Sequence, residues 1–297
     1  MNNYQNHPLA GAVDLDSAFN KMWFFYKKHF VGLYIISVVS ALLTSFITSG
    51  IDLASFQEAS TDPQLVMEKL REMAGPYALT MLVSLVFGVL LHAWVLEKPS
   101  GEQGFISAVT RKTLTAMIPY LVAALILLIL TVLLTSVGLI LLVLPGLFAM
   151  FYMLTVLIFS MPVTLVETRN PFEVVSRSFR LTHKNFWANL GWVIVVLLII
   201  IVASIVIGAL VMLPFSGSFI SSITNPDEAS SLLEMHRNPL FIGLNALLGG
   251  LITPVMPILA FLLYFRNRGD EVTVEVTTDN DDRVKVEDLY PPMPEKE

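Results

Sequence analysis

The chain has 297 residues, of which 55% are hydrophobic and only 14% are charged, whereas a typical soluble domain has about 25% charged residues. This composition excludes a water-soluble fold. Its apolar runs of about 20 residues are long enough to cross a hydrocarbon core of ~30 Å as α-helices. The net charge of -6 comes largely from the C-terminal tail, because ten of the 24 acidic residues lie in the last 28 positions. The sequence therefore predicts an all-α, polytopic membrane helix bundle.

Three segments are expected along the chain. Residues 1–29 have no apolar core of the signal-peptide kind, so we expect no cleavage and assign them to a cytoplasmic N-terminus with an amphipathic interfacial helix. Residues 30–265 form the transmembrane domain, and residues 266–297 an acidic cytoplasmic tail, disordered or used for docking, in which VTVEV at 272–276 is compatible with a strand. The apolar runs predict six spans: Phe30–Gly50, Pro76–Val95, Leu114–Leu134, Gly138–Leu165, Trp187–Leu213 and Leu240–Phe265.

One apolar block, Leu114–Val166, must hold two of these spans, and two places in it could reverse the chain. Thr135–Gly138 is the turn that we favour. Leu144-Pro145-Gly146 would then be a kink or a short re-entrant break, because proline removes a backbone donor and glycine relaxes the backbone.

The basic residues predict the orientation, since positively charged segments are retained on the cytoplasmic side. With both termini inside, the cytoplasmic segments hold 15 of the 18 Lys and Arg residues. The outer loops keep only Lys69, Arg71 and Arg237, set among acidic residues. We therefore expect six spans with both termini in the cytoplasm.

Three pseudo-repeated units are expected, each an amphipathic interfacial helix followed by a transmembrane hairpin. The third has an apolar stripe of Phe172, Val175, Phe179 and Phe186; the first has Leu15, Phe19, Met22, Tyr26 and Phe30; the middle one is shorter, with Phe105, Ala108 and Val109. Asp62-Pro63 and Asn225-Pro226 each look like the start of a short outer helix.

Basic residues border these stripes. They are Arg177, Arg180 and Lys184 in the third unit and Lys21, Lys27 and Lys28 in the first. Such helices lie in the headgroup plane, with cationic side chains reaching lipid phosphates. These six residues either only set topology and anchor the helices, or form a site for an anionic headgroup.

Ionisable residues within a membrane usually mark function, and the predicted spans contain no Asp, Glu, Lys or Arg. His92 is the exception, either an interfacial histidine beside Trp94 or a proton-linked or ligand-binding group. Histidine spacing offers no metal site, and catalysis by Glu167 or Glu173 is disfavoured because Glu173 suits the first turn of a helix after Pro171. We expect no enzyme activity, no cofactor, no metal and no nucleic-acid partner.

Small residues and prolines in the last two spans predict packing. Ser204 and Gly208, and Ala246 and Gly250, have the spacing that lets helices approach closely, with Asn245 placed to hydrogen-bond across the contact. Pro254 and Pro257 predict a kink in the sixth span.

The segment from 138 to 187 resembles the membrane domain of glycerophosphoryl diester phosphodiesterases and related bacterial multi-pass families. The residues that carry the resemblance are Pro145-Gly146, Pro162, Glu167, Ser178, Leu181-Thr182 and Phe186-Trp187, and LLYFRNRGDE at 262–271 is similar to the exit from the family's last span. The resemblance implies a bacterial cytoplasmic membrane location. It does not imply hydrolysis, because in the enzyme a separate soluble barrel performs the chemistry and only 32 residues follow Phe265.

Together these observations predict a non-enzymatic scaffold or accessory module associated with anionic lipid headgroups and with a membrane protein partner. The alternative is a permease or lipid-handling transporter. A transporter predicts a polar, water-filled cavity between the hairpins, whereas a scaffold predicts a closed, dry bundle.

Overall fold

The computed structural model describes residues 4, 7–11, 15–51, 63–100, 104–217 and 235–281. Every regular element in these ranges is a helix, so the predicted all-α class is confirmed. The α-helices are α1 (Leu15–Lys28), α2 (Phe30–Ser49), α4 (Pro63–Glu97), α5 (Phe105–Leu141), α6 (Val143–Val166), α7 (Pro171–Lys184), α8 (Phe186–Met212), α11 (Pro239–Gly249) and α12 (Val255–Asp281). Short 3-10 turns are η3 (Lys98–Ser100), η4 (Leu213–Phe215) and η6 (Met235–Arg237). Five helices of the described ranges, α2, α4, α5, α6 and α8, are long and apolar enough to cross a membrane.

Helix α7 shows how local sequence sets the ends of these helices. The Asn170 side chain accepts a hydrogen bond from the backbone N–H of Phe172, and Pro171 takes the first helical position. Glu173 lies in the first turn, and the basic Lys184 lies in the last. Both charges complement the helix dipole, so the expected place of Glu173 is confirmed.

The favoured turn between the third and fourth spans is wrong. Helix α5 continues through Thr135–Gly138 to Leu141, and the chain reverses at Leu142, whose backbone is extended (φ -168°, ψ 157°). The reversal lies here because Gly138 and Gly146 meet across it: a Cβ on Gly138 would be 2.7 Å from Cα of Gly146. Side chains of any size at these positions would hold the two helices apart, and Pro145 becomes part of the first turn of α6 rather than a kink.

The sixth predicted span is also not one helix. Its residues are divided between α11 and α12, which are separated by the turn at 250–254. Proline at 254 explains the break, since it cannot donate to the preceding turn, so the expected kink is a full interruption. Helix α12 then continues past Phe265 to Asp281, and residues 272–276 are helical rather than a strand. The remaining tail, 282–297, lies outside the described residues.

The predicted repeat is visible in two of its three units. Helices α1 and α7 are separate from the spans that follow them. The middle amphipathic segment is instead the beginning of α5. Pro63 begins a helix as expected, but that helix is α4 itself and runs through Pro76 without a separate outer helix. The second expected outer helix, at Asn225-Pro226, lies outside the described residues.

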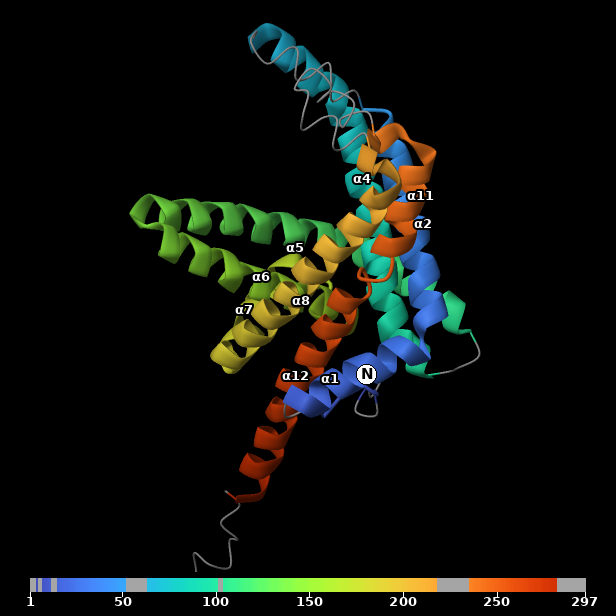
Figure 1. Ribbon diagram of the computed structural model, residues 1–297. Helices are drawn as coiled ribbons and strands as arrows, with labels where there is room; N and C mark the ends of the chain where they lie inside the picture. Colours follow the sequence, from blue (N-terminus) through green and yellow to red (C-terminus); the bar gives the residue numbers. More distant parts are fainter. Residues whose placement is uncertain are drawn as a thin grey trace, which may run out of the picture.

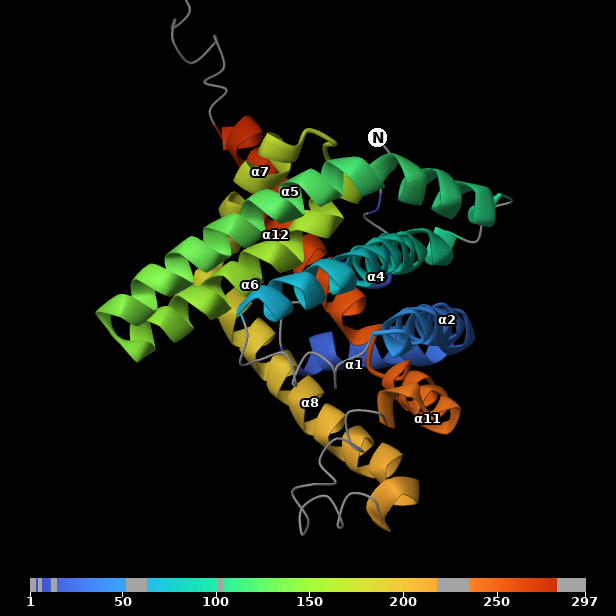
Figure 2. The same cartoon turned by 90° about the horizontal axis from the view of Figure 1, so that it is seen from above.

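The buried core lies at one end of the helices. It is built from 89–96 of α4, 109–123 of α5, 159–165 of α6, 192–196 of α8 and 258–265 of α12, with α1 packed against them. Away from this core, none of residues 64–88 of α4 and 197–210 of α8 is buried. Figure 1 shows the consequence: α2, α4 and α11 run side by side, whereas the α5–α6 hairpin projects away from them. Figure 2 shows α2 nearly end-on and the hairpin lengthwise.

Candidate functional site: the cationic rim and the groove between α4 and α5

Helix α1 has a buried apolar face and an exposed face that carries both aromatic and basic residues. Met22 and Phe25 are buried against the core. Trp23 and Phe24 lie on the opposite side and are 59% and 62% exposed. Cations accompany them: Nζ of Lys27 is 5.3 Å from the Trp23 ring centroid, and Nζ of Lys28 is 6.0 Å from the Phe24 ring centroid. A helix that exposes aromatic rings beside ammonium groups has the side chains of a membrane-surface helix.

The other basic residue predicted on α1 has a structural contact. Nζ of Lys21 donates a 2.6 Å hydrogen bond to the backbone carbonyl of Ala10. Its charge therefore holds the N-terminal segment 7–11 against α1.

The three cations predicted on α7 also divide into two kinds. Arg177 forms a salt bridge with Glu167, with Nε 2.6 Å from Oε2. Lys184 donates a 3.0 Å hydrogen bond to the backbone carbonyl of Asn267 on α12. Arg180 is exposed on the surface that also carries the 73% exposed Phe172. Two of the three cations thus connect elements of the fold, and Arg180 faces outward.

Glu167 is the centre of a polar contact that the sequence did not reveal. Besides Arg177, it accepts a 2.9 Å hydrogen bond from the hydroxyl of Tyr264, and Arg268 donates to the same hydroxyl at 3.4 Å. These bonds join the C-terminal end of α6 to α7 and α12. Glu167 is therefore explained by packing, since its carboxylate is occupied by structural partners. The sequence marked Glu167 through the resemblance and as a disfavoured catalytic candidate, but not through these contacts, because its partners are up to 97 positions away.

A second contact, also not predicted, is a pair of buried amides. Asn189 on α8 and Asn267 on α12 are both 0% exposed. Nδ2 of Asn267 donates to Oδ1 of Asn189 at 2.9 Å, and Nδ2 of Asn189 donates to the carbonyls of Leu181 and Thr182 at 3.2 Å each. Because these carbonyls end α7, one amide pair joins three helices. No spacing rule links positions 78 residues apart, so the sequence offered no signal for it.

The N-terminal segment is fixed at the same end of the molecule by a third polar contact. Glu97 accepts a 2.9 Å hydrogen bond from the hydroxyl of Tyr4 and forms a 2.7 Å salt bridge with Lys112. Glu97 is only 7% exposed. The first residues of the chain, the end of α4 and the beginning of α5 are therefore joined through one carboxylate.

His7 lies beside this contact and is buried against aromatic rings, with its ring centroid 4.7 Å from that of Phe265. The backbone N–H of Leu9 donates to Nδ1, so Nε2 carries the proton and donates to the carbonyl of Val95 at 3.1 Å. Burial lowers the pKa of His7 to about 4, and His29 acts in the same direction, whereas the Val95 hydrogen bond opposes the change. His7 is thus neutral in the folded protein at pH 7.

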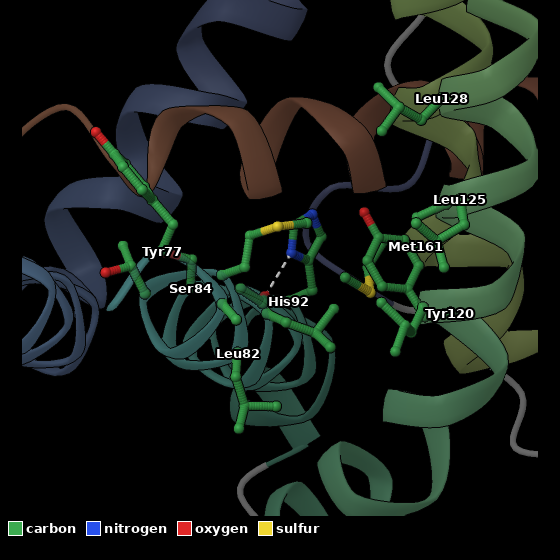
Figure 3. Close-up of a pocket in the computed structure, with 15 residues that line it drawn as sticks. Tyr77, Leu82, Ser84, His92, Tyr120, Leu125, Leu128 and Met161 are labelled. Carbon is green, nitrogen blue, oxygen red and sulfur yellow. Dashed lines mark hydrogen bonds between the residues drawn. The ribbon is translucent and has the colours of Figure 1, made fainter. Parts of the chain in front are cut away.

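A groove of about 680 Å³ lies between α4 and α5. Figure 3 shows the side chains that line it. They are mostly apolar, with Leu82 and Leu125 at its partly exposed rim and Met161 of α6 behind. His92 points into this groove beside Tyr120. Its Nδ1 donates to the carbonyl of Gly88 at 2.8 Å, so Nε2 of the neutral ring is an acceptor facing the groove.

Helices α8 and α11 contact each other, but the small residues predicted to bring helices close do not all do so. Ser204 and Gly208 of α8 and Asn245 of α11 line a cavity of about 320 Å³ instead of packing tightly. Gly250 does allow a close approach, but to α2: a Cβ there would be 2.7 Å from Cγ2 of Val38.

Comparisons with known proteins bear on the region that contains Glu167, Arg177 and Asn189. The family model for the membrane domain of glycerophosphoryl diester phosphodiesterase matches residues 128–223. No curated protein and no solved structure matches the chain. Signature residues identified in the sequence, among them Glu167, Ser178 and Thr182, lie inside the matched region, and Ser178 and Thr182 are fully buried. The chain is therefore a multi-pass membrane protein that is similar, over residues 128–223, to the membrane domain of glycerophosphoryl diester phosphodiesterase.

Proposed function

We propose that this chain is a non-enzymatic module of the bacterial cytoplasmic membrane that binds anionic lipid headgroups and serves as a scaffold or accessory subunit for a membrane protein partner. The observation that carries the proposal is the outer face of α1, where Lys27 and Lys28 lie beside the exposed rings of Trp23 and Phe24. Rings of this kind favour the interface between headgroups and acyl chains. The adjacent ammonium groups are then at the level of the lipid phosphates.

The six predicted cations have two roles in this proposal. Lys27, Lys28 and Arg180 are exposed and bind headgroups. Lys21, Arg177 and Lys184 hold the helices that present them, through the contacts to Ala10, Glu167 and Asn267.

We call the exposed cations Lys27, Lys28 and Arg180, with the helix surfaces that carry them, the cationic rim. The arrangement of the helix ends supports a cytoplasmic position for it. Of the 15 basic residues assigned to the cytoplasmic side, 12 lie in segments that the structure describes, and these segments adjoin the end of the molecule where the core lies. Positively charged segments are retained on the cytoplasmic side. Both termini, and the binding surface of α1 and α7, then face the inner leaflet, whose anionic lipids attract them.

The test compares the thermal unfolding of the detergent-solubilised protein with added phosphatidylglycerol or phosphatidylcholine. Each cation near an anionic surface contributes about 1 kcal/mol, so K27Q/K28Q/R180Q should weaken phosphatidylglycerol binding by roughly 100-fold. The stabilisation by this lipid should be lost, while the melting temperature without lipid stays that of the wild type. Arg71→Gln, on the exposed N-terminal part of α4, is the matched control and should keep the full response. If the triple variant responds to phosphatidylglycerol as the wild type does, the headgroup role is wrong.

The partner can be sought in the same preparation. Native mass spectrometry of the complex extracted in mild detergent should show a retained anionic lipid and a copurifying membrane subunit. A protein that elutes alone under conditions that preserve the lipid would contradict the accessory role.

The groove between α4 and α5 supports a second candidate, a lipid-handling transporter. Its volume is within the range of ligand pockets, about 300–1,000 Å³, and its apolar lining suits an acyl chain rather than a water-soluble substrate. Leu125→Trp would fill the groove, whereas Leu133→Trp changes an exposed position of α5 that is not part of the lining. A transporter predicts that only the first variant loses a retained lipid and lipid transfer between leaflets. Equal behaviour of both variants would exclude the groove as the path.

A further inference from the structure

The turn of the α5–α6 hairpin has an unusual composition. Residues 137–151, which include the end of α5 and the beginning of α6, contain no charged or polar side chain. We call residues 137–148 the hairpin tip. Most of its side chains are strongly exposed, with Ile140 at 83%, Leu142 at 69% and Leu144 at 78%. At the end of the tip, the ring centroid of Phe148 is 6.1 Å from that of Phe186 on α8. A loop that emerges into water would normally carry polar turn residues. The tip instead has a surface suited to hydrocarbon.

Two backbone N–H groups at the turn have partners within the hairpin. The N–H of Leu142 donates to the carbonyl of Gly138 at 2.9 Å, and the N–H of Gly146 donates to the carbonyl of Leu142 at 3.3 Å. Pro145 has no N–H to satisfy. The close Gly138–Gly146 contact reverses the chain with one extended residue, Leu142. Irregular backbone is tolerated in a bilayer where its polar groups have partners, and these two hydrogen bonds meet part of that requirement.

The direction of the hairpin differs from that of α2 and α4, which are helices of membrane length. Helix α2 has 20 residues and a length of about 30 Å, which matches the hydrocarbon core. Figures 1 and 2 both show that α5 and α6 run across the direction of α2 and α4. If α2 and α4 cross the membrane, the hairpin extends sideways through it. The two helices of the hairpin pack most extensively against each other, and α7 and the beginning of α8 contact α6.

From these observations we infer that the hairpin tip remains inside the bilayer, with lipid acyl chains as its partner, and forms no outer loop. The inference concerns a surface distinct from the cationic rim and stands independently of headgroup binding. It changes the expected topology, because α5 and α6 then form a re-entrant hairpin rather than two complete crossings. Both ends of the hairpin still lie on one side, so both chain termini keep the same orientation.

The chain has no cysteine, so single-cysteine variants report on individual positions. Leu142→Cys and Leu144→Cys probe the tip, and Glu68→Cys, at an exposed position in the first part of α4, probes the outer side. A membrane-impermeant maleimide applied to intact spheroplasts should label Glu68→Cys, while both tip variants react at least an order of magnitude more slowly from either side of the membrane. All three should react after denaturation in detergent. Labelling of Leu142→Cys at the rate of Glu68→Cys would overturn the inference.

A second measurement separates burial in lipid from burial in protein. The same three cysteines are labelled with bimane in vesicles of phosphatidylethanolamine and phosphatidylglycerol whose acyl chains carry bromine. Fluorescence at the tip should be quenched by the brominated chains and not by aqueous iodide, and Glu68→Cys should show the reverse pattern. Quenching of the tip by iodide would show exposure to water. Quenching by neither agent would show that another protein surface, such as a second copy of the chain, covers the tip, and would equally overturn the lipid assignment.

Discussion

The Asn189–Asn267 pair allows a quantitative test of how α12 is held. Asn267→Leu keeps the volume of the side chain but removes its four side-chain hydrogen bonds, to Leu263, Asn185 and twice to Asn189. It also leaves Oδ1 of the fully buried Asn189 without this donor. An unsatisfied buried acceptor costs about 1–3 kcal/mol, and a net hydrogen bond contributes about 0.5–1.5 kcal/mol. Since leucine recovers part of this loss through apolar burial, we expect a destabilisation of about 3 kcal/mol.

The assay is thermal unfolding in a fixed detergent, in which a loss of this size lowers the melting temperature by roughly 5–10 °C. Asn245→Leu, the same substitution at an exposed position of α11, is the control and should change the melting temperature little. The double variant N189L/N267L should lose less stability than the sum of the two single variants. Each single variant leaves one buried amide without its partner amide, whereas the double variant removes both amides. Equal effects of Asn267→Leu and Asn245→Leu would refute the structural role of the pair.

Three further changes should have measurable effects. Gly138→Ala should destabilise the hairpin by more than about 1 kcal/mol in thermal unfolding, because the new Cβ would overlap the backbone of α6; Gly208→Ala, where a Cβ meets nothing within 4 Å, should be neutral or stabilising, and the reverse order would contradict the turn geometry. His7 has a pKa of about 4 when folded and 6.5 when unfolded, so stability present above pH 6.5 should be lost as the pH falls toward 4, by up to about 3 kcal/mol. His7→Gln should flatten this part of the pH profile, and an unchanged profile would mean that His7 is not buried. Lys112→Met should cost about 3 kcal/mol because it removes the ammonium group that pairs with the buried carboxylate of Glu97; in a K112M/E97Q variant, part of that loss should return, and additive losses would argue against the ion pair.

The helices were predictable where the local sequence was sufficient. Apolar runs of membrane length indicated α2, α5, α6 and α8, and Asn170 with Pro171 indicated the start of α7. These signals depend on the residue's own neighbours and on the requirement that backbone groups in a bilayer bond within a helix.

The turns between helices were harder to predict. Thr135–Gly138 has better turn residues than the segment around Leu142, yet α5 passes through it. The local preference for a turn at Thr135–Gly138 did not decide the position of the reversal, because the Gly138–Gly146 contact allows the two helices to approach. That contact depends on two positions considered together.

The candidate site was only partly predictable for a related reason. The cations of α1 and α7 could be identified from their spacing. The spacing did not show which of them would form contacts within the protein and which would remain exposed. Arg177 and Lys184 differ from Arg180 because Glu167 and Asn267 lie beside them, and Asn267 arrives from the end of the chain. The groove with His92 likewise needs α5 next to α4.

The sequence by itself determined that the protein is solvated by lipid, that it is helical and where its cations lie along the chain. A bilayer imposes these properties on each segment separately, since the cost of an exposed backbone group or a charge in hydrocarbon does not depend on the neighbouring helices. Only the tertiary structure decided that the core lies at one end, that Glu167 and the Asn189–Asn267 amides join α6, α7, α8 and α12, and that the α5–α6 hairpin projects away from α2 and α4. Lipid is as apolar as the side chains of these helices. The apolar pattern therefore could not specify which helices pack together. A few buried polar pairs and close glycine contacts specify this instead.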